Sequence, residues 1–296
     1  GMRSLVGGTA LGAARVVTLL DKIAATCPES ITSPDSKGLL PGQVAKASSH
    51  LLVRQWGACC GAFLGRYELQ GVAVHSSATC LVIFATNVAD PSQPEVALKF
   101  MTNKDEWQRE QAMRKNGEAE LSGEHVLQLR RTQALSEDEV RACRENPKLR
   151  GDKDYRFLLE MPKAERDLSD LLSHDRIAGW NKAAVVDILR QVAKHLQYLH
   201  RECGRIHGDL KPRNIVKVPN PDSETGGRWI LIDMDASCTL GDLAGQKVTS
   251  SAYFPPEMAR RELKKEGGGV PATVPFEMWY YGLLVFQLCS LDGQTV

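Results

Sequence analysis

The sequence lacks an excess of charge of either sign. Its 296 residues include 37 Lys or Arg and 36 Asp or Glu, which gives a formal net charge of +1 at pH 7. Proteins dedicated to DNA or RNA carry a basic face for the phosphate backbone, so we expect no nucleic-acid partner. With 43% hydrophobic and 25% charged residues, the composition is that of a globular protein and excludes disordered and collagen-like chains.

Paired cysteines and long apolar runs are also missing. The eight cysteines form no Cys-x-x-Cys pair, so neither a zinc site nor a disulfide framework is indicated. Cys59 and Cys60 are adjacent, but no second cysteine pair lies near them to complete a metal site. We therefore expect reduced thiols in a cytoplasmic compartment. No run reaches the roughly 20 apolar residues that span a bilayer, and Arg15 interrupts the Gly- and Ala-rich N-terminal stretch. We expect neither a membrane partner nor a cleaved targeting signal.

Two parts of the chain differ in character. Residues 1–62 contain a helix expected at 11–25, followed by a linker rich in proline and glycine. Residues 63–296 form the main domain, with an N-terminal lobe at about 63–160 and a partial C-terminal lobe at about 161–296.

The main domain begins with strand signals and continues with helix signals. Short β-prone runs predict a small antiparallel sheet with strands at 67–74, 79–85, 95–101, 126–129 and 156–160. A charged helix is expected at 103–115 and a solvated helical insertion within 130–154. Apolar residues at intervals of three and four predict a core-facing helix at 183–201. The sequence therefore predicts an α+β fold.

A carboxylate, an ammonium and an amide stand within six residues just after that helix. They are Asp209, Lys211 and Asn214. Phosphoryl transfer uses such a set: Asp209 would orient the attacking hydroxyl, Lys211 would face the transferred group, and Asn214 would ligate a divalent metal. Asp209 and Lys211 are the predicted catalytic residues.

A second carboxylate follows a β-prone run at 229–232. Asp233 stands at the end of this run, where it can join Asn214 as a ligand of Mg²⁺ that bridges phosphates. Asn214 and Asp233 are the predicted metal ligands.

These segments resemble the catalytic core of eukaryotic protein kinases, over roughly residues 67–296. Val96-Ala97-Leu98-Lys99 is similar to the third-strand motif whose lysine holds the α- and β-phosphates of ATP, and Glu110 fits the helix glutamate that orients this lysine. His207 to Asn214 resembles the catalytic loop. Asp233-Met234-Asp235 stands where the family has its metal-binding Asp-Phe-Gly.

The resemblance extends to the nucleotide pocket and the substrate platform. Leu159-Glu160-Met161 is similar to the hinge that receives adenine on backbone groups, and Ser250 to Glu257 is similar to the end of the activation segment. Residues 276–288 resemble the hydrophobic helix that anchors the large lobe. The resemblance implies a two-lobed α+β fold, ATP and Mg²⁺ as cofactors and a protein substrate. It implies nucleotide-binding roles for Lys99, Glu110, Val74, Ser77, Val82, Ala97, Leu159, Glu160 and Met161.

The loop that covers the phosphates departs from the family pattern. His75, Ser77 and Cys80 stand where the family has three glycines. Glycine allows the backbone to approach phosphate closely, so we expect a weaker or differently arranged grip on the nucleotide. Hydroxyl and amide groups of residues 76–78 are expected to compensate in part.

Four further departures lie around the catalytic loop. Gly208 replaces the arginine that pairs with a phosphorylated activation segment, and Glu277 replaces an anchoring Asp. Arg114 stands where the family has an apolar residue on the charged helix, a role that Met113 can take. Asp235 replaces the last glycine of Asp-Phe-Gly.

The first hypothesis is a Ser/Thr protein kinase, because Lys211 two residues after Asp209 is the Ser/Thr-directed pattern and Ser250 fits the hydroxyl that accompanies it. A catalytically impaired scaffold is the alternative that the missing glycines favour. A small-molecule kinase of the aminoglycoside or choline type stays open because His-Gly-Asp-Leu is common there. Since the sequence ends soon after the anchoring helix, we expect a fragment or a truncated product of a larger protein.

Overall fold

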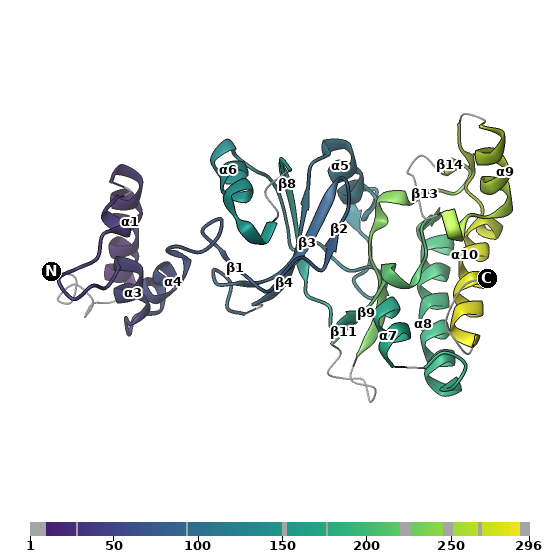
Figure 1. The fold of residues 1–296 in the computed structure, drawn as a ribbon, viewed down its shortest axis with the longest axis horizontal. Helices are drawn as coiled ribbons and strands as arrows, with labels where there is room; N and C mark the ends of the chain where they lie inside the picture. The colour runs from purple at the N-terminus through teal and green to yellow at the C-terminus, as the bar shows by residue number, and fades with distance from the viewer. Residues whose placement is uncertain are drawn as a thin grey trace. The chain divides into compact units, whose positions relative to one another are not determined.

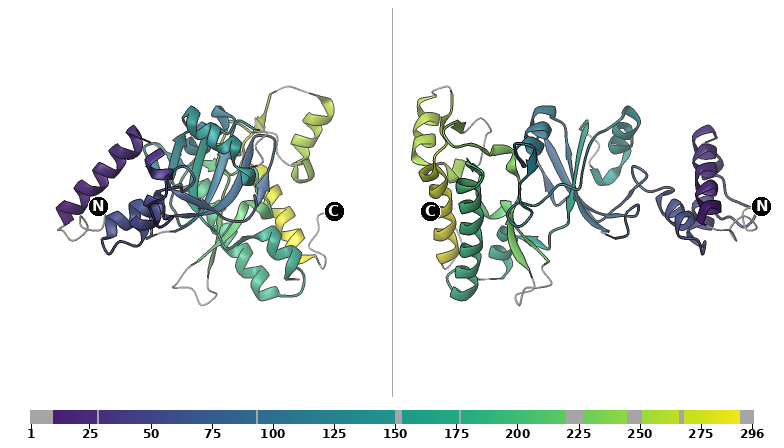
Figure 2. Two further views of the ribbon diagram at one scale, coloured as in Figure 1. Left: turned by 60° about the vertical axis from the view of Figure 1, so that its left-hand side comes forward. Right: turned by 180° about the vertical axis from the view of Figure 1, so that it is seen from behind.

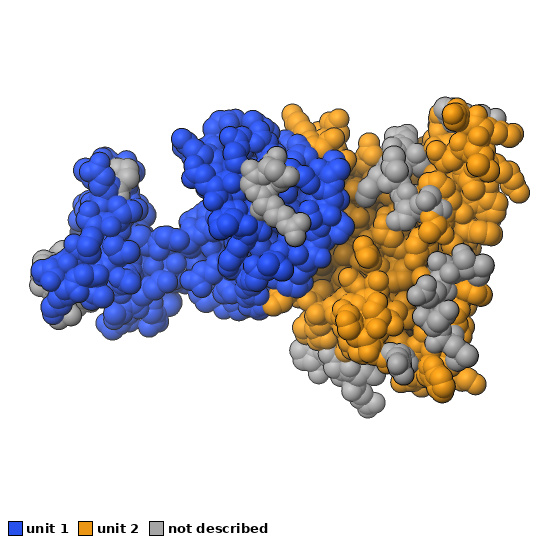
Figure 3. Space-filling view, viewed as in Figure 1, with its two compact units in different colours: residues 1–102, 132–160 blue, residues 103–131, 161–296 orange. Residues whose placement is uncertain are grey.

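The chain divides into two compact units, which Figure 3 shows in two colours. Unit 1 contains residues 1–102 and 132–160, and unit 2 contains residues 103–131 and 161–296. The structure is a computed structural model, and it describes residues 10–27, 29–92, 94–149, 153–175, 177–219, 227–244, 251–265 and 268–290.

Unit 1 is built on a six-stranded sheet in the order β1-β3-β4-β8-β7, with β2 also paired to β3 (Figure 1). Its strands are β1 (Tyr67–Leu69), β2 (His75–Ser76), β3 (Cys80–Asn87), β4 (Glu95–Met101), β7 (Arg131–Ala134) and β8 (Phe157–Pro162). β1, β2 and β4 all run antiparallel to β3. The strand predicted at 95–101 forms as β4 with the same bounds, because this apolar run is buried along nearly its whole length.

One face of this sheet carries the core of unit 1. Side chains alternate between the two faces of a strand, and on this face β3, β4 and β8 present Leu81, Ile83, Val96, Leu98, Phe100 and Leu158, all fully buried. Helix α6 (Glu137–Glu145) adds the buried Val140 and Cys143 to the same cluster. The helical insertion expected within 130–154 thus forms, but its inner side packs into the core instead of being solvated all round.

The fourth strand lies later in the sequence than expected. Residues 126–129 form no strand; Val126 makes an isolated bridge to Leu231, and Leu127 N donates to Leu231 O at 2.9 Å. The edge strand is β7, whose residues are mostly exposed. Its polar sequence carries no alternating apolar signal, whereas 126–129 is apolar because it packs in unit 2.

The segment expected as a linker forms further helices. After α1 (Ala10–Thr26) come α2 (Glu29–Thr32), α3 (Pro41–Lys46) and α4 (Leu51–Cys59). A Cβ at Gly57 would lie 2.5 Å from Lys46 N, so this glycine permits the close approach of α3 and α4. Trp56 Nε1 on α4 donates to Asp21 Oδ1 on α1 at 2.8 Å. Pro41 thus begins helix α3, and Gly57 lets α4 pack closely against α3. Neither residue interrupts a helix.

Unit 2 is mainly helical around one apolar cluster. Its helices are α5 (Lys104–Ala112), α7 (Leu168–His174), α8 (Lys182–Arg201), α9 (Pro256–Lys264) and α10 (Val274–Cys289). α8, predicted at 183–201, buries Val185, Ile188, Val192, Leu196 and Leu199 in that cluster. α8 and α10 lie side by side in Figures 1 and 2, joined by Tyr281 Oη donating to Leu189 O at 3.1 Å.

Short strands and turns complete unit 2 and position the loops of the site. The strands are β5 (Lys115–Asn116), β6 (Ala119–Glu120), β9 (Arg166–Asp167), β10 (Arg205–Ile206), β11 (Ile215–Val218), β12 (Arg228–Leu231), β13 (Cys238–Thr239), β14 (Leu243–Ala244) and β15 (Val270–Pro271). Single 3₁₀ turns form at Pro212–Asn214 (η3), Met234–Ala236 (η4) and Ser251–Tyr253 (η5), and one in unit 1 at Pro147–Leu149 (η2). Among the described residues, no helix is both long and apolar enough to cross a bilayer.

Candidate active site

The loop that carries the predicted catalytic residues is held by α10. Glu277 is fully buried, and its Oε2 accepts hydrogen bonds from the backbone N–H groups of His207 and Gly208, the latter at 3.3 Å. Asp209 N donates to His207 Nδ1 at 3.3 Å, and His207 Nε2 lies 2.9 Å from Ile232 O. This pattern assigns the imidazole proton to Nε2. Glu277 thus makes the backbone contacts for which the family uses Asp.

Asp209, Lys211 and Asn214 come together in this loop. Lys211 Nζ lies 2.7 Å from Asp209 Oδ2, and Asn214 Nδ2 donates to that oxygen at 3.2 Å and to Asp209 O at 2.8 Å. Asp209 is 1% exposed. Its other carboxylate oxygen, Oδ1, has no hydrogen-bond partner among the described residues. One carboxylate oxygen is thus engaged by an internal cation, whereas the other is buried without a hydrogen-bond partner.

Two titratable side chains near this loop are uncharged. Burial raises the pKa of the Cys238 thiol to about 11, and the Glu277 carboxylate adds to the rise. Burial also raises the pKa of Tyr253, which donates its hydroxyl to Gln287 Oε1 at 3.2 Å. Both side chains are therefore uncharged at neutral pH.

The structure explains why position 208 is glycine. Gly208 has φ +81°, and a Cβ there would lie 2.4 Å from Ala236 O. The arginine that the family carries at this position does not fit this backbone. The loss of a phosphate-binding arginine is thus tied to the close packing of the catalytic loop against η4.

Gly208→Ala is expected to destabilise unit 2 by more than the left-handed backbone alone would cost, which is about 1–2 kcal/mol. The extra loss comes from overlap with Ala236 O. Gly241→Ala is the matched control, because Gly241 has φ +94° with nothing within 4 Å of its Cβ position. Urea unfolding gives the free energy of unfolding of both variants. Equal losses of this free energy in Gly208→Ala and Gly241→Ala would contradict the overlap with Ala236 O.

The predicted metal ligands lie on adjoining backbone segments. Asp233 follows β12 in a left-handed conformation, φ 64° and ψ 66°, which is uncommon for a non-glycine residue. Ile232 N donates to Asn214 O at 3.0 Å. This bond joins the segment before Asp233 to the end of η3.

Glu110 lies in an acidic cluster with Asp233 and Asp235. These three carboxylates offer oxygen atoms within 4.8 Å of one another. Glu110 is 1% exposed, and its Oε1 lies 3.0 Å from Nη2 of the buried Arg114. The Glu110–Arg114 ion pair was not anticipated from the sequence, although the i,i+4 spacing was an available signal.

Most nucleotide-binding residues predicted in unit 1 share one face of its sheet. Val82 pairs with Lys99, and Ala97 precedes Lys99 by two residues, so all three point to the face opposite the core. Leu159 follows the core residue Leu158 and points the same way. Lys99 is 8% exposed. Because Lys99 belongs to unit 1 and Glu110 to unit 2, their ion pair stays a prediction.

The hairpin between β2 and β3 is closed by a serine side chain. Ser77 N donates to Cys80 O at 2.9 Å, and Cys80 N donates back to Ser77 Oγ at 3.2 Å. The Ser77 hydroxyl, expected to face phosphate, is therefore part of the turn. The Ser77 carbonyl oxygen instead accepts a hydrogen bond from Lys153 Nζ. Val74, before β2, is exposed.

The Glu160 side chain is engaged inside unit 1. Its Oε2 accepts from Tyr67 Oη at 2.6 Å and its Oε1 from Asn87 Nδ2 at 3.1 Å. Only the backbone of this residue is left for adenine, and β8 continues from there to Met161. Tyr67 and Asn87 were not assigned from the sequence; Ser250 lies outside the described residues.

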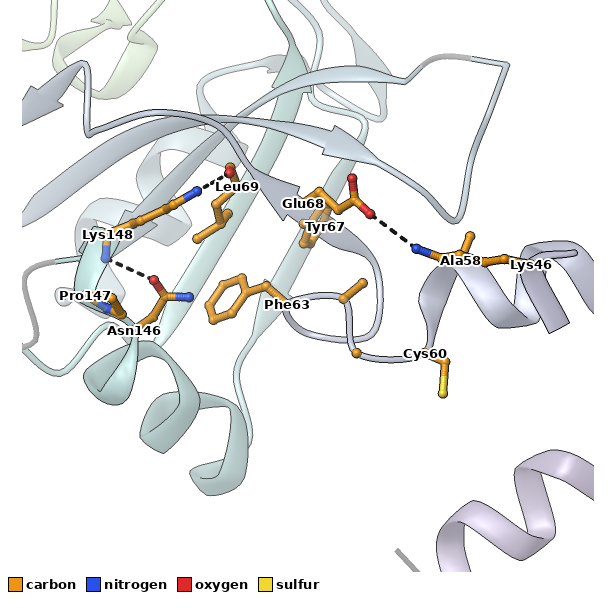
Figure 4. A pocket seen from close by; sticks show the side chains of 12 residues that line it. Lys46, Ala58, Cys60, Phe63, Tyr67, Glu68, Leu69, Asn146, Pro147 and Lys148 are labelled. Carbon is orange, nitrogen blue, oxygen red and sulfur yellow. Dashed lines mark hydrogen bonds and ion pairs between the residues drawn. The ribbon is translucent and has the colours of Figure 1, made fainter. Parts of the chain in front are cut away.

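A separate hollow of about 460 Å³ lies in unit 1 and contains none of the predicted site residues (Figure 4). It is bordered by the ion pair of Lys46 and Glu68 at 3.7 Å, and by Lys148 Nζ donating to Leu69 O at 2.6 Å.

Comparison with known proteins agrees with this geometry. Residues 85–293 match the family model of the protein kinase domain. Serine/threonine-protein kinase Kist of Mus musculus is 26% identical over 137 residues, 45% of this chain and 31% of that protein. Serine/threonine-protein kinase CHK1 of Saccharomyces cerevisiae is 29% identical over 145 residues, 48% of this chain and 25% of that protein.

The aligned part of this chain thus spans less than a third of each of these two relatives. The expected α+β fold, with a sheet in one unit and mainly helices in the other, is confirmed. Since the family model covers well over half of the sequence, this chain belongs to the protein kinase family.

Proposed function

We propose that this chain transfers the γ-phosphoryl group of ATP to serine or threonine hydroxyls of a protein substrate. The observation that carries the proposal is the Asp209 carboxylate, in which Oδ2 is held by Lys211 and Asn214 while Oδ1 has no hydrogen-bond partner among the described residues. A general base acts within hydrogen-bond reach of the proton it takes. Asp209 Oδ1 would accept the hydroxyl proton as the substrate oxygen attacks.

The donor set fits Mg²⁺. Asn214 spends its amide nitrogen on Asp209, so its amide oxygen is the remaining ligand atom, and Asp233 adds a carboxylate. Oxygen donors of these types are what Mg²⁺ prefers. A bound Mg²⁺ neutralises charge on the phosphates during transfer.

Other residues of this chain would position ATP. Lys99 would hold the α- and β-phosphates, and the backbone at Glu160 and Met161 would receive adenine. Val82, Ala97 and Leu159 share the face of Lys99 and would cover the base. Lys211 would face the charge on the transferred group.

The acceptor class rests on Lys211 and on the relatives, which are named as serine/threonine kinases. All eight cysteines are free thiols, which supports a cytoplasmic location for the activity.

Thermal unfolding with and without Mg·ATP tests the proposal, together with mass spectrometry of a mixed Ser, Thr and Tyr peptide pool. Mg·ATP at a hundred times its Kd would stabilise the protein by about 2.7 kcal/mol, and phosphate would appear on Ser or Thr. Binding without transfer would favour a kinase-like scaffold, which the serine-closed hairpin also fits. Transfer to aminoglycoside or choline alone would favour a small-molecule kinase.

Lys153→Ala is expected to raise the KM for ATP several-fold with a smaller change in kcat, because the hairpin tip loses its contact at Ser77 O. Lys148→Ala is the matched control, since Lys148 also donates to a backbone carbonyl, that of Leu69 (Figure 4). Steady-state kinetics compares them. Equal KM values in the two variants would refute a role of Lys153 at the tip.

A further inference from the structure

Two unusual residues lie in the same buried region of unit 2. Arg114, just after α5, replaces an apolar residue of the family pattern, and Asp235 in η4 replaces a glycine. Arg114 is 3% exposed and Asp235 is 4% exposed. A buried charge is costly unless it is paired, so each residue needs a compensating charge nearby.

Glu110 connects the two. Its Oε1 lies 3.0 Å from Arg114 Nη2, and its carboxylate shares the 4.8 Å cluster with Asp233 and Asp235. Helix α5 packs against η4. The two departures from the family therefore meet at one carboxylate.

The charges of the two departures cancel. Like charges 4–5 Å apart repel strongly where the effective dielectric constant is low. Asp235 adds one negative charge to the pair formed by Glu110 and Asp233. Arg114, whose guanidinium stays protonated in proteins, adds one positive charge. Together, Arg114 and Asp235 add no net charge to this region.

We propose that Arg114 and Asp235 form a compensating pair of positioning residues, which keeps Glu110 and Asp233 placed for the phosphates and the metal. Arg114 holds Glu110 by one oxygen and offsets the repulsion that Asp235 introduces. The effect of this pair on catalysis rests on the proposed function. The electrostatic coupling between Arg114 and Asp235 does not.

The coupling predicts unequal effects of single substitutions. Arg114→Met leaves three close carboxylates with one cation fewer. Asp235→Asn keeps the shape of the side chain, and Arg114 stays paired with Glu110. The loss caused by Arg114→Met should therefore shrink once Asp235 has been neutralised.

A double-mutant cycle on urea unfolding measures this. Arg114→Met is expected to raise the unfolding equilibrium constant at least about a hundredfold, as breaking a buried ion pair does. Asp235→Asn should raise it less than about tenfold, and the double variant should recover at least about tenfold of the first loss. Arg114→Lys, which keeps the charge, should lose less than Arg114→Met. Additive effects would overturn the proposal.

The double variant also decides the case in which Arg114→Met does not fold. A folded double variant then supports the compensating pair, and an unfolded one overturns it.

A Mg²⁺ titration without nucleotide separates positioning from packing. Arg114→Met removes a positive charge from beside the three carboxylates, whereas Arg114→Lys keeps it. The rise in Tm with Mg²⁺ should therefore be largest in Arg114→Met, stay close to the wild-type value in Arg114→Lys and return to it in the double variant. If Arg114→Met is unfolded, Asp235→Asn should show a smaller rise than wild type. An unchanged Mg²⁺ response in the folded variants would overturn the positioning role. Neither measurement requires phosphoryl transfer, so an inactive wild-type protein would refute the proposed function and leave this test intact.

Discussion

Asp209→Asn is expected to lower the rate of phosphoryl transfer by about 10²- to 10⁴-fold, the usual contribution of a positioned general base. The amide that replaces the carboxylate cannot take the proton of the attacking hydroxyl. Asn has nearly the same shape as Asp, and Asn214 still has the backbone oxygen of residue 209 as its partner at 2.8 Å. The loop should therefore keep its fold, and Mg·ATP binding should be essentially unchanged.

The measurement compares single-turnover phosphorylation with the Mg·ATP thermal shift. Asp242→Asn is the matched control, because Asp242 is an exposed carboxylate of unit 2 outside the loop. Wild-type activity in Asp209→Asn would remove the residue from catalysis. Loss of both binding and transfer would show that the substitution acts on the structure of the loop.

The regular elements with clear apolar patterns were predictable. β4 and α8 occur at or within one residue of the predicted bounds, since burial on one or both faces imposes period 2 or 3.6 on the sequence. β7 escaped prediction because its side chains are mostly exposed and polar, so no apolar pattern marks the strand. The helices α3 and α4 were missed for a different reason. Their proline and glycine were interpreted locally, while the close approach of Gly57 to α3 is a tertiary contact.

The site residues also divide into those that local spacing predicts and those that only tertiary contacts reveal. The spacing of Asp209, Lys211 and Asn214 confines them to one loop, so their proximity could be predicted from the sequence. The partner of Glu110 was missed although the i,i+4 spacing indicates it, because Arg114 was interpreted as a replaced apolar contact. Met113 does pack against the cluster that contains Met234, and this frees Arg114 for the carboxylate. The structure shows that Met113 makes the apolar contact and that Arg114 makes the ion pair.

Lys99→Met is expected to lower kcat/KM at least about a hundredfold, the usual loss when one preorganised donor to a reacting oxyanion is removed. Lys99 is buried on β4 beside Val82 and Ala97. Removing one partner of a buried ion pair also lowers stability, so each rate is divided by the folded fraction from urea unfolding. Lys217→Met, on strand β11, is the control for changing a strand lysine. Full activity of Lys99→Met would exclude Lys99 as the phosphate ligand.

Glu110→Gln tests which glutamate orients that lysine. Glu110 is fully buried on α5 and Glu106, one turn earlier, is only half-buried. We expect about a tenfold loss of kcat for Glu110→Gln, of the order of one charge-assisted hydrogen bond, and little change for Glu106→Gln. Because Glu110→Gln also weakens the pair with Arg114, each rate is divided by the folded fraction from urea unfolding. The opposite order of the two losses would assign the lysine partner to Glu106 and leave Glu110 as the partner of Arg114 alone.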